Sequence, residues 1–145
     1  MRFMGFGMTA DIIVEKENEI VLIKRKNEPY KGYWEMPGGF VEENETVEET
    51  ALREVTEETS LKVKLKEILG VYSDVKRDPR GRVTTVVFIT EAVGGKLKAD
   101  TDAEDARWFD VNDVDADSLA FDHPKIFRAY LKWKKQKRTY WSGRE

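Results

Sequence analysis

The alternation of apolar and polar positions predicts β-strands over the first two thirds of the chain. Four segments are rich in β-branched and aliphatic residues over a length typical of strands: Thr9–Glu15, Glu19–Lys24, Leu61–Tyr72 and Arg82–Ala92. The first two flank the polar stretch Lys16–Asn18 and therefore predict a hairpin. Asp78–Gly81, which reads Asp-Pro-Arg-Gly, predicts a turn between the last two. Arg107–Phe109 is a shorter apolar segment further along the chain.

Two segments have the periodicity of helices. Thr46–Ser60 opens with Thr46 and Glu49 at the spacing of a capping box. Phe121–Lys137 carries apolar residues on one side: Ile126, Phe127, Tyr130 and Leu131. Gly32–Gly39, rich in glycine, proline and aromatic residues, predicts a loop. With no internal repeat or linker, this order of elements predicts a single domain of the α/β (α+β) class, in which helices pack against a mixed β-sheet.

Composition narrows the functional classes. The chain has 145 residues, of which 40% are hydrophobic and 37% are charged. This supplies a sizeable core but is too polar for a membrane protein. The absence of cysteine excludes disulfides and a cysteine nucleophile and fits a cytoplasmic protein. Because His123 is the only histidine, a metal site would need oxygen ligands, which favours Mg²⁺ or Mn²⁺.

The charge distribution argues against a nucleic-acid partner. The net charge of the chain is −3, so the molecule as a whole offers no attraction to a polyanion. The C-terminal run Lys132–Arg144 is locally basic, but a run of this kind is typical of a solvated helix face or a frayed end.

The candidate chemistry lies on the first predicted helix. Glu54, Glu57 and Glu58 stand at i, i+3 and i+4, which places three carboxylates on one face. Glu54 and Glu58 fall beside Val47, at the margin of the apolar stripe. Crowded carboxylates repel one another, and a position at the edge of the core adds a desolvation cost. A bound divalent cation would remove both penalties, so the pattern favours a metal site over a solvated acidic face.

These acids belong to a longer pattern that resembles the Nudix box, G-x5-E-x7-R-E-U-x-E-E-x-G-U, where U is a bulky aliphatic residue. The matching positions are Gly39, Glu45, Arg53, Glu54, Val55, Glu57, Glu58 and Leu61. Ser60 stands where the family has glycine, and we expect a slightly strained helix cap there, costing about 1 kcal/mol, with the site intact. Trp34–Glu42 resembles the usual segment before the box, and Ala106–Phe109 resembles a late strand of the family. The resemblance implies an α-β-α sandwich with the mixed sheet between helices.

The resemblance also implies a function, the Mg²⁺-dependent hydrolysis of a diphosphate linkage in a nucleoside diphosphate derivative, with Mn²⁺ as an alternative ion. The implied metal ligands are Gly38, through its carbonyl, Glu54, Glu57 and Glu58. Arg53 would orient a neighbouring glutamate, Glu57 in the first place, while Glu45 would support the loop or an outer metal. The general base is either Glu57 or an acid from a later loop, Glu104 or Asp105, and the sequence does not choose between them.

The substrate is predicted less directly. Tyr72–Gly81 resembles a loop of ADP-ribose pyrophosphatase-like members, although Val75 replaces a proline that they often carry, and Trp34–Met36 is closer to the nucleoside triphosphate branch. We favour ADP-ribose, with triphosphates second. Four basic residues are candidates to hold phosphates: Lys24, Arg25, Arg77 and Arg80. Several aromatic residues are candidates to stack on a base: Trp34, Tyr30, Tyr33 and Phe121.

The sequence also leaves two alternative functions open and gives expectations about partners. A catalytically silent nucleotide sensor is one alternative, although every box carboxylate is present. A decapping role assisted by the basic tail is another, against which the net acidity argues. The expected partner is a small nucleotide, with no membrane and no nucleic acid, and a homodimer is compatible with this class of protein.

Overall fold

A computed structural model describes residues 5–99 and 103–144 and is built around one mixed β-sheet. Its strands are β1 (Phe6–Lys16), β2 (Glu19–Arg25), β3 (Trp34–Glu35), β4 (Gly38–Phe40), β5 (Leu61–Tyr72), β6 (Arg82–Gly95), β7 (Ala103–Asp110) and β8 (Tyr140–Trp141). They are ordered β3-β2-β1-β6-β5-β8, while β4 pairs with β1 and β7 with β2. The β1–β6 and β5–β8 pairs are parallel, and the other pairs are antiparallel. The predicted hairpin and the four predicted strands are therefore confirmed.

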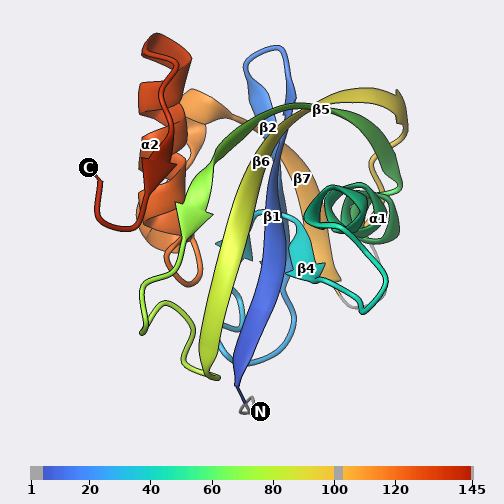
Figure 1. Ribbon diagram of the computed structural model, residues 1–145. Coiled ribbons are helices and arrows are strands. Elements are labelled where there is room, and N and C mark those ends of the chain that lie inside the picture. The colour runs from blue at the N-terminus through green and yellow to red at the C-terminus, as the bar shows by residue number, and fades with distance from the viewer. Residues whose placement is uncertain (1–4, 100–102, 145) are drawn as a thin grey trace.

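Two helices cover opposite faces of this sheet, α1 (Val47–Thr59) and α2 (His123–Lys135) (Figure 1). The strand β1 shows why two layers form. Ile12 and Val14 belong to the core cluster that contains the apolar residues of α1, whereas Ile13 belongs to the cluster around α2. Because alternate side chains of a strand point to opposite faces, an apolar run of this kind must be buried on both sides. The predicted sandwich of helices around a mixed sheet is confirmed.

The first helix has the predicted ends. The Thr46 hydroxyl accepts a hydrogen bond from the Glu49 N–H, and the Glu49 side chain accepts one from the Thr46 N–H, so the capping box is complete. Ser60 closes the helix in the left-handed conformation, with φ 63°. The strained cap expected from the replacement of glycine by Ser60 is therefore present.

The second helix begins two residues later than predicted. The prediction started it at Phe121, but Phe121 has φ 54°, outside the helical region, and the helix starts at His123. Pro124 follows at once, and proline suits a first turn because the N–H that it lacks has no partner there.

Neither helix of the described ranges is long and apolar enough to cross a membrane.

The stretch predicted as a loop, Gly32–Gly39, contains two short strands. Within it, β3 pairs with β2, and β4 pairs with β1 through Gly38 opposite Asp11 and Gly39 opposite Ala10. A Cβ at Gly38 would overlap the carbonyl oxygen of Ala10, so the close approach of the two strands requires glycine there. This pairing fixes the Pro37–Gly39 backbone beside the acidic face of α1.

Candidate active site

Two of the three predicted acids of α1, Glu54 and Glu58, lie against the β4 backbone. Glu58 accepts a hydrogen bond of 2.8 Å from the Gly38 N–H. The Glu54 carboxylate lies so close to Gly39 that a Cβ there would stand 2.7 Å from its Oε2, with the other carboxylate atoms closer still. Glu57, the third acid, has a side chain that is 56% exposed. The helix thus presents two partly buried acids against the glycine pair and one acid toward solvent.

Arg53 connects these acids to the loop before the helix. Its guanidinium donates two hydrogen bonds to Glu45, of 2.6 and 2.8 Å, one of 2.8 Å to Glu54 and one of 3.1 Å to Glu57. It also donates to the carbonyl of Phe40 at 3.1 Å. Glu57, the partner first expected for Arg53, is therefore one of several, and the two-bond contact is to Glu45. These bonds lower the pKa of Glu45 to about 2.

Negative charge is concentrated around Glu58. Burial raises the pKa of the Glu58 carboxyl well above its ordinary value, and the charges of Glu35, Glu54 and Asp11 raise it further, against the hydrogen bond from Gly38. The pKa of Glu35 is also raised, first by burial. Carboxyls that are hard to ionise next to one another are what a site built for a cation shows before the cation binds.

The donors fit a hard divalent cation. Glu54, Glu57, Glu58 and the Gly38 carbonyl offer oxygen atoms alone, which suits Mg²⁺ or Mn²⁺. No three acidic or histidine side chains within residues 5–99 and 103–144 already stand at metal-binding distance from a common point. The α1 carboxylates would therefore have to turn toward one another, and of the three, Glu57 is the most exposed.

A cleft of about 230 Å³ opens beside these acids and is lined by both signs of charge. Its acidic lining comes from three elements and comprises Asp11, Glu35, Asp78 and Glu58, and its basic lining comprises Arg25, Arg77 and Arg80. The three arginines proposed from sequence as phosphate ligands are therefore brought together, although they come from β2 and from the loop before β6. Gly38, Gly39 and Phe121 also line the cleft.

Each of these arginines is held by a carboxylate through two hydrogen bonds. Arg25 contacts Glu35 at 3.1 and 3.0 Å, Arg77 contacts Asp122 at 2.9 and 2.7 Å, and Arg80 contacts Asp78 at 3.0 and 2.8 Å. The ring of Phe121 lies between two of them, 4.9 Å from Arg25 Cζ and 5.4 Å from Arg80 Cζ. A guanidinium has five N–H donors, so two bonds to a carboxylate leave others for a ligand.

Sequence reasoning missed a buried cluster around Asp11. Burial alone would raise the pKa of Asp11, but its contacts with His123, Arg77 and Thr85 outweigh burial and lower it. His123 Nδ1 accepts from the Met36 N–H at 3.1 Å, so its ring proton sits on Nε2, which faces Asp11 Oδ1 at 3.7 Å. The signal was present in the sequence, because Asp11 interrupts an otherwise apolar stretch of a predicted strand.

Three predicted site residues lie elsewhere. Trp34 packs edge-on against Phe109, with ring centroids 4.9 Å apart, and is not among the residues that line the cleft. Glu104 is exposed and pairs with Lys24 at 3.7 Å, while Asp105 binds Arg107 at 2.6 Å. Substrate contact by Trp34 and base catalysis by Glu104 or Asp105 stay predictions without support from this arrangement.

The chain was compared with known proteins. A family model described as the NUDIX domain matches residues 5–130. An ADP-ribose pyrophosphatase of Methanocaldococcus jannaschii is 54% identical over 128 residues, which cover 88% of this chain and 75% of that protein. The crystal structure of a NUDIX hydrolase from Nitrosomonas europaea superposes with a TM-score of 0.82 at 26% identity, covering 97% of this chain and 78% of that one.

A second solved structure contains a ligand. It is the NUDIX domain of Shewanella oneidensis NrtR complexed with ADP ribose, which superposes with a TM-score of 0.75 at 26% identity, over 90% of this chain and 89% of that one. Hydrolases of this kind generally need a divalent metal ion, in agreement with the oxygen-only donor set on α1. The fold, the arrangement of the acids and these matches together establish that the chain belongs to the Nudix family and is a pyrophosphohydrolase.

Proposed function

We propose that this chain hydrolyses the diphosphate linkage of ADP-ribose, with Mg²⁺ as its metal ion and Mn²⁺ as an effective substitute. The observation that carries the proposal is the cleft itself, which brings Glu58 of α1 and the Gly38–Gly39 backbone together with three arginines. The identity of 54% with an ADP-ribose pyrophosphatase supports the choice of substrate. All the candidate donors are oxygen atoms, which supports a hard divalent ion such as Mg²⁺ or Mn²⁺.

The residues of the proposed site have two separate roles, metal binding and substrate binding. Glu54, Glu57 and Glu58 would hold the metal together with the Gly38 carbonyl, while Arg53 keeps Glu54 and Glu57 oriented through its bonds of 2.8 and 3.1 Å. A bound divalent ion would neutralise the diphosphate and make the attacking water more acidic. Arg77 and Arg80 also line the cleft, and there they would hold a phosphate oxygen or the terminal ribose of the substrate. The acids therefore organise the reacting centre and the arginines orient the substrate.

The reaction transfers one proton and breaks one P–O bond. Water adds to a phosphorus of the diphosphate, the bridging oxygen leaves with the other phosphate, and ADP-ribose gives AMP and ribose phosphate. The proton of the water passes to a carboxylate, for which we propose Glu57. Its support is position, because Glu57 neighbours the other two proposed ligands on α1 and is exposed to the solvent that supplies the water. Glu104 and Asp105, by comparison, are paired away from the cleft lining.

A nucleotide panel tests this function. ADP-ribose, ATP, dGTP and NADH would each be incubated with the protein and Mg²⁺, and the released monophosphate would be quantified by chromatography. We expect ADP-ribose to give the highest kcat/KM. A protein that ignores ADP-ribose but converts triphosphates to monophosphate and pyrophosphate would belong to the other substrate class, and one that hydrolyses nothing but binds nucleotides would be a sensor.

The loop before β6 offers a second test of the substrate. Arg80→Ala removes one guanidinium from the cleft and should raise the KM for ADP-ribose far more than for a triphosphate. Arg82→Ala is the matched control, because Arg82 begins β6 and its guanidinium lies over Phe6 and not in the cleft lining. Equal effects of Arg80→Ala on both substrates would show that Arg80 binds phosphate in general or only shapes the turn.

The location we propose is the cytoplasm, in line with a composition that contains no cysteine. Fractionation of cells that produce the protein would test it, with activity expected in the cytoplasmic fraction.

A further inference from the structure

Helix α2 and the segment around β8 enclose a hollow whose ionisable lining residues are basic, apart from one tyrosine. It measures about 270 Å³ and is lined by Lys125, Arg128, Ala129, Lys132, Tyr140 and Arg144. Lys125, Arg128 and Lys132 follow one another at i, i+3 and i+7, so they form one stripe along the helix. Ala129 and Tyr140 are 6% and 4% exposed and form a largely apolar floor. Among residues 5–99 and 103–144, no acidic side chain lines it.

The C-terminal segment is fixed over α2 by specific contacts. β8 pairs with β5 through Tyr140 opposite Gly70, where a Cβ would overlap the backbone of Tyr140, so glycine is required for this approach. One residue after β8, the Ser142 hydroxyl accepts hydrogen bonds of 2.8 and 3.1 Å from the N–H groups of Ser73 and Asp74. The hollow is therefore a defined part of the fold, with two of its walls joined to the sheet.

The same segment returns Arg144 to the hollow. The Arg144 N–H donates to the Trp141 carbonyl at 2.9 Å, which closes a turn, and its guanidinium donates to the Thr139 carbonyl at 3.0 Å. Cζ of Arg144 also lies 4.8 Å from the ring centroid of Trp141. From the helix side, Lys125 donates to the carbonyl of Ser142. Cations from two separate elements are thus brought to one place through uncharged partners.

Their charge is only weakly compensated. Residues 123–144 contain eight lysines and arginines and no aspartate or glutamate. Arg128 has one acidic neighbour, Asp117, at 3.7 Å with a side chain that is 92% exposed, and such a pair contributes little. In the part of the chain that the structure describes, Lys132 has no ion pair. The repulsion among these cations is a cost that an anion would remove.

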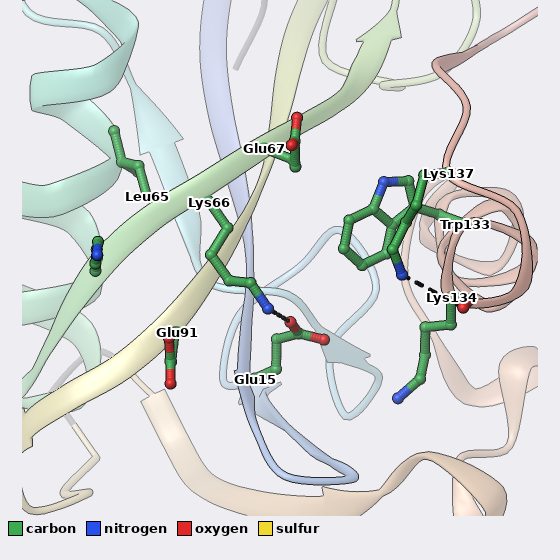
Figure 2. A pocket seen from close by; sticks show the side chains of 9 residues that line it. Glu15, Leu65, Lys66, Glu67, Glu91, Trp133, Lys134 and Lys137 are labelled. Carbon is green, nitrogen blue, oxygen red and sulfur yellow. Dashed lines mark hydrogen bonds and ion pairs between the residues drawn. The ribbon is translucent and has the colours of Figure 1, made fainter.

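A second hollow at the end of α2 shows the contrast. Four lysines and three glutamates are among the residues that line it. Figure 2 shows Lys66 pointing toward Glu15, and Lys66 Nζ lies 2.6 Å from Glu15 Oε1. There, Lys137 lies across the ring of Trp133, with Nζ 3.8 Å from its centroid. One lysine of that hollow, Lys66, is therefore already paired with a carboxylate, and two further glutamates line the same hollow. Within the described part of the chain, the hollow beside β8 has no carboxylate in its lining, which makes it the stronger candidate for an anion.

We propose that the hollow between α2 and β8 binds a small anion that carries a phosphate group, at a site separate from the catalytic cleft. Two guanidinium groups can each donate two parallel hydrogen bonds to phosphate oxygens, and two ammonium groups add charge. We infer a small anion for two reasons. The first is the limited volume of the hollow. The second is charge: the whole chain carries −3 although residues 123–144 are strongly basic, so the rest of the chain is strongly acidic and repels a long polyanion.

NMR titration with inorganic phosphate, at constant ionic strength and with EDTA present, tests the site directly. We expect saturable amide shifts in residues 125–132 and 140–144, separate from any shifts in the catalytic cleft. Arg128→Gln with Lys132→Gln should weaken this binding at least tenfold, because two charged donors are lost, while glutamine preserves the helix. Lys135→Gln with Arg138→Gln removes the same charge from exposed positions outside the hollow and should leave binding unchanged.

Three results would overturn the proposal. The first is shifts in the hollow that stay linear in phosphate concentration, since these indicate no site. The second is an equal loss of binding in the control variant, which would mean that the overall field of the segment attracts the anion. The third is binding of a single-stranded oligonucleotide without a terminal phosphate to the hollow at a lower concentration than phosphate requires. This result would mean that the hollow is a nucleic-acid surface.

Discussion

The substitution Gly39→Ala tests whether the acid geometry of α1 depends on the absence of a side chain on β4. A Cβ at this position would stand 2.7 Å from Glu54 Oε2, whereas ordinary van der Waals contact begins at 3.4 Å. The other two carboxylate atoms would be closer, so the Glu54 carboxylate must move by roughly 1 Å, a displacement that can cost about 100-fold in rate at a catalytic site. We therefore expect kcat/KM to fall about 100-fold, equivalent to about 2.7 kcal/mol of transition-state stabilisation.

Stability should respond differently from activity. The backbone at Gly39 is in a strand, where alanine is favoured over glycine by about 0.5–1 kcal/mol. Against this, Glu54 would lose part of its 2.8 Å hydrogen bond to Arg53 at a partly exposed position, a loss of about 1 kcal/mol or less. The free energy of unfolding should therefore stay within about 1 kcal/mol of wild type, although the protein is largely inactive.

The assay combines steady-state hydrolysis of ADP-ribose, Mn²⁺ titration followed by electron paramagnetic resonance, and urea denaturation. Gly94→Ala is the control, because a Cβ at Gly94 meets only Lys62 Cβ at 3.8 Å and should leave activity and metal affinity unchanged. Activity and metal affinity of Gly39→Ala equal to those of wild type would refute the reasoning that the position of Glu54 limits the reaction. A large loss of stability would show instead that the substitution disturbs the β1–β4 pairing.

Three further predictions concern the charged groups of the box. Glu57→Gln should lower turnover by roughly two to four orders of magnitude and weaken Mg²⁺ binding while the protein stays folded, and near-normal activity in this variant would remove Glu57 from the mechanism. Glu58→Gln should raise the free energy of unfolding in EDTA, because burial and neighbouring acids disfavour the ionised carboxylate that the substitution removes. The same variant should lose metal-dependent activity. Equal stability of variant and wild type in urea would contradict the first expectation. Glu45 has a lowered pKa of about 2, so its contribution to stability is complete above its ordinary pKa of 4.5 and is lost as the pH falls toward 2. The stability difference between wild type and Glu45→Gln should accordingly shrink over that range, and a constant difference in urea denaturation at pH 2.5 and pH 6 would exclude the Arg53 bond as its cause.

The long elements were predictable because each carries its own periodicity. β5 has the predicted bounds, Leu61–Tyr72. For α1, the capping box marked the start of the helix, and Ser60, which stands where the family pattern has glycine, marked its end. The short strands β3, β4 and β8 have two or three residues, too few for any pattern, and they form because a partner strand is in place. The start of α2 was misplaced because an apolar Phe121 continues the helical pattern while its backbone does not.

The site was predictable only where it is local in sequence. Spacing along one helix gave Glu54, Glu57 and Glu58, and the family pattern added Arg53. Asp11 and His123 could not be connected to them, because their proximity depends on the pairing of β1 with β4 and on where α2 begins. The pairing of Arg53 mainly with Glu45 likewise depends on how the loop before α1 folds back, which no periodicity encodes.

The parallel pairing of β1 with β6 has a consequence for how the protein is made. Phe6 lies opposite Arg82 and Glu15 opposite Glu91, so the central pair of the sheet joins segments separated by most of the first two thirds of the chain. During synthesis, β1 and its hairpin partner β2 leave the ribosome long before β6 exists, and one edge of β1 stays open until then. Contacts of such high sequence separation form slowly. Because Arg77 and Arg80 immediately precede β6, the cleft cannot be complete before this late step, and newly made chains gain activity only when their central strand pair has closed.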